Sequence, residues 1–183
     1  MPPLTPEEGA ELLQIAQDAL RLHLFCGQPY QGTPVHPSLF CPGAVFVTLK
    51  RGGLPRGCIG HLIPREPLYL SVAECAVAAA TRDPRFDRVR EEELAEIRID
   101  ISVLSPLEIV ADLSLIEVGT HGLYIEKGDC HGVLLPQVAV ELGLDRDQFL
   151  DLTCRKAGLP PDAWRHGAVI KVFSCQIFHS EPL

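Results

Sequence analysis

The chain opens with apolar residues at helical spacing. They recur three or four positions apart, at Leu12, Ile15, Ala16, Ala19 and Leu20. The preceding segment Thr5-Pro6-Glu7-Glu8 is a capping box with proline at the first helical position, and Gly27 is a natural stop. The pattern predicts a helix from about residue 6 to residue 25.

Three later stretches also show helical signals. Residues 68–81 are rich in alanine and carry apolar side chains on most sides, which is typical of a well-buried helix. Asp145 followed by Gln148 is a second capping pair, and it opens a helix that Gly158 closes. A shorter helix is predicted for residues 138–142.

Strand patterns occupy much of the remaining chain. Residues 97–103 alternate isoleucine or valine with polar residues, and this clear period of two predicts a half-buried antiparallel strand. Residues 44–49 predict a buried strand that turns back at 51–53. Residues 123–125 and 133–135 predict a hairpin. A last long strand is predicted for residues 168–178, whereas the proline-rich residues 29–42 predict a loop.

The order of these elements decides the fold class. Helices and strands do not alternate regularly, so the sequence predicts an α+β fold with a mostly antiparallel sheet packed with helices. The 183 residues, with a hydrophobic fraction of 46%, suffice for one domain with a sizeable core. The sequence contains no internal repeat.

Charge and cysteine content narrow the function classes. The net charge of −8 disfavours nonspecific binding to nucleic acid, and the arginines between residues 82 and 90 are interrupted by acidic residues. The seven cysteines are odd in number and contain no Cys-x-x-Cys pair. Since the sequence also has no signal-peptide pattern and no apolar run of about 20 residues, we expect reduced thiols, a cytoplasmic location and no membrane span.

The segment Arg56-Gly57-Cys58-Ile59-Gly60 is the most suggestive chemically. Its glycines allow positive φ and close backbone approach, so that amides converge on an anion, and Arg56 offers a charge for a carboxylate or phosphate. Cys58 is then a candidate nucleophile. A bulge between strands around a buried cysteine explains the same composition, and Cys58 with His61 is a weak half of a metal site.

At these residues the sequence resembles the AMMECR-type domain, whose bacterial and archaeal members are called AmmeMemoRadiSam system protein A. The matching stretches are Arg56 to Gly60, Asp83-Pro84-Arg85-Phe86, Ile101 to Pro106, Gly119-Thr120-His121-Gly122-Leu123, Leu134 to Ala139, Cys154 to Leu159 and Trp164. Pro55 stands where the family usually has leucine, and His61 and His131 also depart from its pattern.

The resemblance implies more about fold than about activity. It covers about residues 8–179 and implies one domain over residues 5–180, made of two intimately joined subdomains. The family's glycine–cysteine loop is implied to be an active or interaction site. The family name implies a Memo-like protein and a radical S-adenosylmethionine protein as partners. This chain lacks the Cys-x-x-x-Cys-x-x-Cys cluster motif, so radical chemistry belongs to a partner, and we expect no cofactor or metal in this chain.

Four residues are candidates to assist Cys58. His121 lies between glycines, where it can act as a general base or bond the turn backbone. Glu74 lies in an apolar helix, so we expect partial burial, either in an ion pair with Arg56 or Arg85 or as a catalytic acid. Arg85 can clamp an anion above Phe86, or simply follow a helix stop. Gln137 can contact a ligand or cap a loop.

Two main functions remain open from the sequence, beside a third in which Cys58 and His61 belong to a metal protein. In the first, the chain is an enzyme or enzyme subunit that uses Cys58 as nucleophile or thiol carrier, with Arg56, Gly57, Gly60, Arg85 and Gln137 binding the substrate. In the second, it is a non-enzymatic adaptor whose glycine loop docks a protein or peptide.

Overall fold

The computed structural model describes residues 2–181, and the chain folds as two compact units. Unit 1 runs to Leu104 and includes the segment from Gln176 onward, whereas unit 2 comprises Ser105–Cys175. Both units combine helices with an antiparallel sheet, so the predicted α+β class is confirmed.

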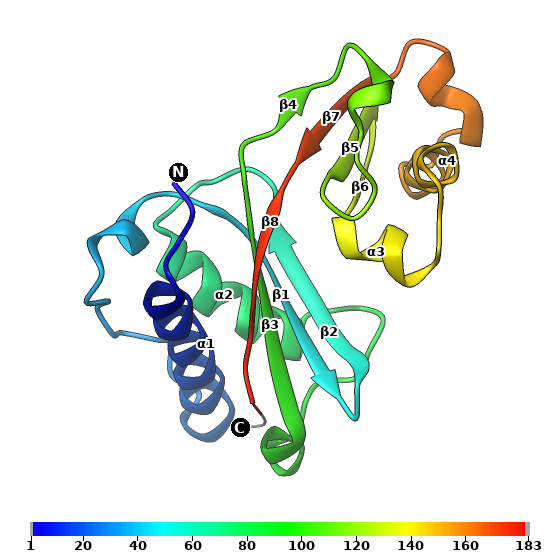
Figure 1. Cartoon of the computed structure of the whole chain (residues 1–183). Coiled ribbons are helices and arrows are strands. Elements are labelled where there is room, and N and C mark those ends of the chain that lie inside the picture. Colours follow the sequence, from blue (N-terminus) through cyan, green and yellow to red (C-terminus); the bar gives the residue numbers. More distant parts are fainter. Residues whose placement is uncertain (1, 182–183) are drawn as a thin grey trace. The chain divides into compact units, whose positions relative to one another are not determined.

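Unit 1 is a four-stranded sheet with two long helices (Figure 1). Its elements are α1 (Pro6–Cys26), η1 (Pro37–Phe40), β1 (Ala44–Arg51), β2 (Leu54–His61), α2 (Leu68–Thr81), η2 (Glu91–Glu96), β3 (Ile97–Leu104) and β8 (Cys175–His179). The strand order is β2-β1-β3-β8, with β2 at an edge.

The two predicted helices of unit 1 are confirmed. Thr5 and Glu8 form the capping box of α1, and Gly27 ends this helix with a φ of 64°. Helix α2 spans the predicted residues 68–81, and most of its side chains are buried. The predicted strand at 97–103 pairs antiparallel with β1, which turns back at Gly52 and Gly53.

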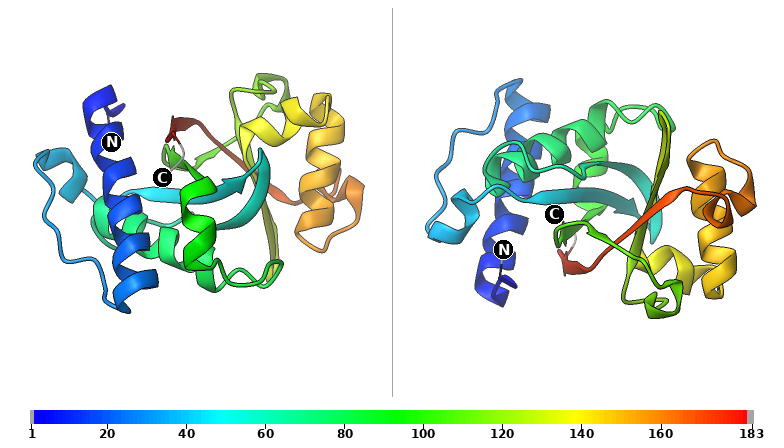
Figure 2. Two further views of the ribbon diagram at one scale, coloured as in Figure 1. Left: turned by 90° about the horizontal axis from the view of Figure 1, so that it is seen from below. Right: turned by 90° about the horizontal axis from the view of Figure 1, so that it is seen from above.

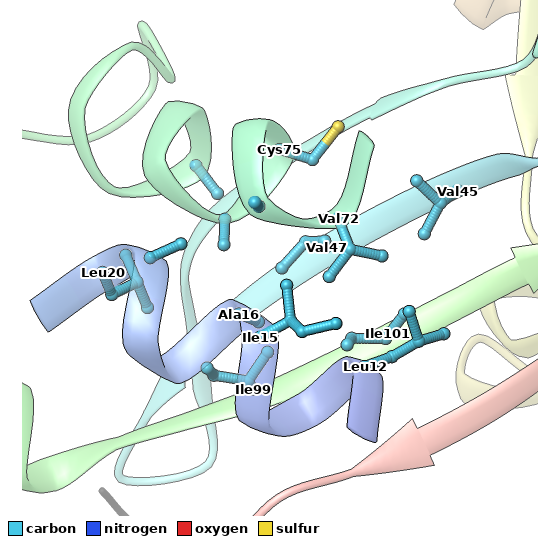
Figure 3. Close-up of a cluster of buried hydrophobic side chains, with 14 of the residues drawn as sticks. Leu12, Ile15, Ala16, Leu20, Val45, Val47, Val72, Cys75, Ile99 and Ile101 are labelled. Carbon is cyan, nitrogen blue, oxygen red and sulfur yellow. The ribbon is translucent and has the colours of Figure 1, made fainter. Parts of the chain in front are cut away.

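Alternation places the core of unit 1 on one face of its sheet. Val45 and Val47 of β1 and Ile99 and Ile101 of β3 point toward α1 and α2 and are fully buried (Figure 3). Because successive side chains of a strand point to opposite faces, Thr48 and its neighbours at even positions lie on the other face. Neither α1 nor α2 covers this second face, which we call the helix-free face.

Unit 2 is a smaller sheet with two helices. Its elements are β4 (Glu108–Ile109), η3 (Leu113–Leu115), β5 (Gly122–Lys127), β6 (Cys130–Leu134), α3 (Pro136–Glu141), α4 (Arg146–Lys156), η4 (Pro161–Arg165) and β7 (Val169–Phe173). The strand order is β4-β7-β5-β6, and α4 lies along one side of these strands (Figure 2). The predicted hairpin and both predicted helices are confirmed.

Two predictions about strands were wrong. Residues 168–178 form two strands, because the chain leaves the sheet of unit 2 at Ser174 and β8 joins the sheet of unit 1. Residues 54–61 form a strand where we expected a glycine loop, and its register with β1 shifts at Arg56, between the pairs Leu49–Gly57 and Lys50–Pro55. None of the described helices is long and apolar enough to cross a membrane.

Candidate functional site

Cys58 lies in the middle of β2, and its glycine neighbours have extended backbones. Positive φ angles occur at other glycines but at neither Gly57 nor Gly60. The expectation of an anion-binding nest at these glycines is therefore wrong. What the glycines permit is close approach. A Cβ on Gly57 would lie 2.0 Å from the carbonyl oxygen of Ala79, and one on Gly60 would lie 2.4 Å from the ring of Phe46.

The backbone of Cys58 is held by an aspartate from the turn after α2. The amide of Cys58 donates to Oδ2 of Asp83 at 2.8 Å. Arg85 donates to both carboxylate oxygens of Asp83, at 3.0 and 2.7 Å, and also toward the carbonyl oxygen of Cys58 at 3.4 Å. These contacts provide hydrogen-bond partners for the amide and the carbonyl oxygen of Cys58 at the free edge of β2.

Asp83 is almost fully buried in this arrangement. Its side chain is 2% exposed, whereas that of Arg85 is 62% exposed and stacks on Phe86, with 5.4 Å between the guanidinium carbon and the ring centre. Hydrogen bonds from Arg85 and from the Cys58 amide outweigh burial and lower the pKa of Asp83 to about 2. Arg85 therefore clamps Asp83, an anion of the chain itself, while its guanidinium lies over Phe86.

The sulfur of Cys58 lies on the helix-free face of the sheet. Cys58 pairs with Thr48 across β1, and the Thr48 hydroxyl donates to Sγ at 3.1 Å. The cysteine is half-buried and free of disulfide bonding. A hydroxyl donor beside a sulfur stabilises negative charge on it, which a thiol nucleophile requires.

Cys58 begins a row of polar residues that crosses the sheet. Thr48 pairs in register with Asp100 of β3, and Asp100 accepts from Nδ1 of His179 on β8 at 2.8 Å. Lys50 lies 2.6 Å from the other oxygen of Asp100. We call Cys58, Thr48, Asp100 and His179 the polar row. Burial raises the pKa of Asp100, but the bonds from His179 and Lys50 outweigh it and the net direction is downward.

Arg56 is engaged by other protein groups. Two of its nitrogens each lie 2.9 Å from a carboxylate oxygen of Glu93, and it also donates to the carbonyl oxygens of Asp87 and Arg88. Its hydrogen bonds lower the pKa of Glu93 to about 2. Arg56 thus fastens β2 to the segment before β3.

Glu74 does not have the expected burial or partners. Its side chain is 50% exposed, and it pairs with Arg82 at 3.1 Å and lies 3.8 Å from His61. Glu74 lies on the solvent-exposed side of α2, so its charge does not need a buried partner. Cys58 and His61 are three residues apart on a strand, so their side chains point to opposite faces and do not form a chelating pair.

The other two predicted site residues belong to unit 2. Nδ1 of His121 accepts from the amide of Glu117 at 3.1 Å, which is the turn-bonding alternative. Gln137 lies in the first turn of α3, and its Oε1 is buried without a hydrogen-bond partner among the described residues. Among predicted site residues from different elements of unit 1, the structure brings together Cys58 and Arg85, which are joined through Asp83.

The sequence interpretation missed Thr48, Asp100 and His179. Their signal was the alternation of β1 and β3, in which polar side chains at positions 48 and 50 and at 98 and 100 share a face. Pairing between strands far apart in the chain was needed to join them to Cys58. Within residues 2–181, no group of three or more histidine, cysteine or carboxylate side chains is placed to hold a metal ion.

Comparisons with known proteins match nearly the whole chain. The AMMECR1 family model matches residues 13–178. A protein of Methanothermobacter thermautotrophicus is 44% identical, with 98% of this chain and 97% of that protein aligned. A protein of Methanosarcina mazei is 41% identical over 96% of this chain and 92% of its own length. The crystal structure of an uncharacterised Pyrococcus horikoshii protein, PH0010, superposes with a TM-score of 0.93 at 37% identity, covering 98% of this chain and 94% of that one.

Proposed function

Because this chain belongs to the AMMECR1 family, we propose that its functional group is the thiol of Cys58, acting as a nucleophile or thiol carrier together with partner proteins. One observation carries the proposal. The sulfur is half-buried on the helix-free face of the sheet and receives a hydrogen bond from Thr48, while Asp83 and Arg85 hold its backbone. A thiol on a fixed strand with a hydroxyl donor is well suited to attack an electrophile.

The surroundings of the sulfur favour the carrier role over self-contained catalysis. In unit 1 the described hydrogen-bond partner of Sγ is the Thr48 hydroxyl, which is too weak a base to remove the thiol proton. In a transfer step, sulfur forms a bond to an electrophilic carbon, the leaving group departs with the bonding electron pair, and the thiol proton goes to water or to a base on the incoming molecule. The chain therefore depends on a second molecule.

The proposed partners are a Memo-like protein and a radical S-adenosylmethionine protein, as the family resemblance implies. A cytoplasmic location suits the proposal, because all seven cysteines are free and a reducing compartment keeps them so.

The test is to coexpress the full chain with these two partners and measure its intact mass without reducing agent. The proposal predicts an added mass that maps to Cys58, is absent from Cys58→Ser and persists in Cys26→Ser, a control at an exposed cysteine. An unmodified chain, together with undiminished partner function in Cys58→Ser, would overturn it.

A docking role without chemistry is the second candidate, and one observation favours it. The side chain of Arg85 is 62% exposed beside the edge of β2, and its Nη1 has no partner among residues 2–181. If the chain is an adaptor, the Arg85→Ala variant should no longer capture the Memo-like partner in a pull-down, whereas Cys58→Ser should still capture it. Equal capture by both variants would exclude Arg85 as the docking group.

A further inference from the structure

A cavity of about 690 Å³ opens at the far end of the polar row. Lys50, Arg98, Asp100 and His179 line it, and the hairpin glycines between β1 and β2 form part of its wall. Lys50 pairs in register with Arg98, so both lie on the helix-free face that carries Thr48 and Cys58. The cavity and the thiol therefore share one face of one sheet.

The charges around this cavity are only partly neutralised. Asp100 already pairs with Lys50 and His179. Glu96 accepts hydrogen bonds from two nitrogens of Arg51, at 2.8 and 3.0 Å. Arg98 is exposed and makes no ion pair or side-chain hydrogen bond in the described part of the chain. One guanidinium thus lines the cavity without a counter-charge.

We infer that this cavity binds the carboxylate of a small-molecule ligand whose other end reaches Cys58. The inference rests on the proposed function, and it names the class of molecule that meets the thiol. Asp100 lies two strands from Cys58, and Arg98 lies two residues farther along β3. With strands about 4.8 Å apart and a rise of about 3.3 Å per residue, the Cα atoms of Cys58 and Arg98 are roughly 12 Å apart.

A carboxylate fits these groups better than a phosphate does. A planar guanidinium binds the two oxygens of a carboxylate through parallel hydrogen bonds, and one unneutralised positive charge balances one negative charge. A phosphate dianion would require a second free cation, and Lys50 is already paired with Asp100.

Two maleimides of similar length test the inference on the full-length protein. Maleimidohexanoate carries a carboxylate at the end of its chain, and N-hexylmaleimide carries a methyl group. Labelling rates at each cysteine are read by peptide mass spectrometry. We expect maleimidohexanoate to label Cys58 about fivefold faster than the neutral reagent, as one partly exposed ion pair allows, and to show no such preference at the exposed Cys26 and Cys130.

Matched variants locate the charge effect. The preference should vanish in Arg98→Gln and persist in Arg21→Gln, which removes an exposed arginine of α1. Acetate should suppress it at lower concentration than inorganic phosphate. A preference that survives Arg98→Gln, or stronger competition by phosphate, would overturn the carboxylate site. Rapid labelling of Cys58 by both reagents without a preference rejects this inference alone, whereas slow labelling by both rejects the reactive thiol as well.

Discussion

Asp83 satisfies the backbone of Cys58 at the free edge of a sheet, where an unpaired amide would otherwise meet water or another chain. The aspartate is buried, and Arg85 compensates its charge from the same turn. A buried carboxylate with three donor groups is costly to lose, because its removal leaves the Cys58 amide, the Arg85 amide and the guanidinium without this acceptor.

This coupling predicts a pH-dependent stability. Since the pKa of Asp83 falls from 3.8 to about 2 on folding, its contribution is complete above pH about 4 and disappears as the pH falls toward 2. At pH 7, Asp83→Asn should lower the free energy of unfolding by about 2 kcal/mol. The difference from wild type, measured by urea unfolding, should close between pH 4 and pH 2. Asp87→Asn, an exposed control in the same turn, should change little; an equal loss there would contradict the assignment.

Thr48 provides a second prediction at this scale. Thr48→Val keeps the shape of the side chain and removes the hydroxyl that donates to Sγ. If that bond supports the thiolate, iodoacetamide should label Cys58 about three- to tenfold more slowly in the variant, as expected for a bond worth about 1 kcal/mol. Labelling of Cys130 in the same sample is the internal control. An unchanged rate at Cys58 would show that the hydroxyl has no part in its reactivity.

At the scale of elements, β2 and α2 are in contact through backbone atoms at Gly57. There is no space for a side chain between the strand and the carbonyl of Ala79. The packing of the helix on the sheet thus depends on glycine at this position, and the strand bearing Cys58 is positioned by it.

Gly57→Ala should therefore be more damaging than an alanine that meets only backbone strain. Gly52→Ala in the β1–β2 hairpin is the comparison, because its φ is 57° and no atom lies near the added Cβ. We expect Gly52→Ala to cost about 1 kcal/mol and Gly57→Ala to cost about 3 kcal/mol or more, as overpacking against backbone does. Thermal unfolding measures both. Equal costs would show that β2 and α2 separate easily.

Helices and strands with capping or alternation patterns in their own residues were predictable from the sequence. Strands that depend on pairing with distant parts of the chain were not. The capping boxes at Thr5 and Asp145 and the alternation of residues 97–103 specify their elements locally. Strand β2 was missed because Pro55, Gly57 and Gly60 have low strand propensity, and tertiary contact with β1 and α2 overrides it. The division at Ser174 has no local signal, since both halves of residues 168–178 look like strand.

The candidate site shows the same limit. Cys58 and Arg85 were recognised because their motifs are contiguous in the chain. Thr48, Asp100 and His179 come from three separate strands, and only the register of the sheet places them in one row with the thiol. The role of Arg56 depends on Glu93, which lies 37 residues away in the chain.

At the scale of the whole molecule, the chain builds two separate hydrophobic cores. One surrounds α1 and α2, and the other surrounds Phe149 and its neighbours in unit 2. Separate cores commonly open as separate cooperative units. The Cys58 strand then depends for its stability on the first core.

Ile99→Ala tests this dependence, because Ile99 is fully buried in the core of unit 1. The variant should lose about 2–5 kcal/mol in that unit. Hydrogen exchange should show weaker protection for β1, β2 and β3, while β5 and β7 stay as protected as in wild type. Equal loss of protection in all five strands would mean that the chain opens as one cooperative unit.

The most direct test of the reactive thiol is a comparison of iodoacetamide labelling rates at all seven cysteines of the native protein, at pH 7. Cys58 is half-buried, whereas Cys26, Cys41 and Cys130 are exposed. If accessibility alone set the rates, these three would react first. We predict that Cys58 reacts faster than any of them. Labelling of Cys58 as slow as that of the buried Cys75 and Cys154 would contradict the account.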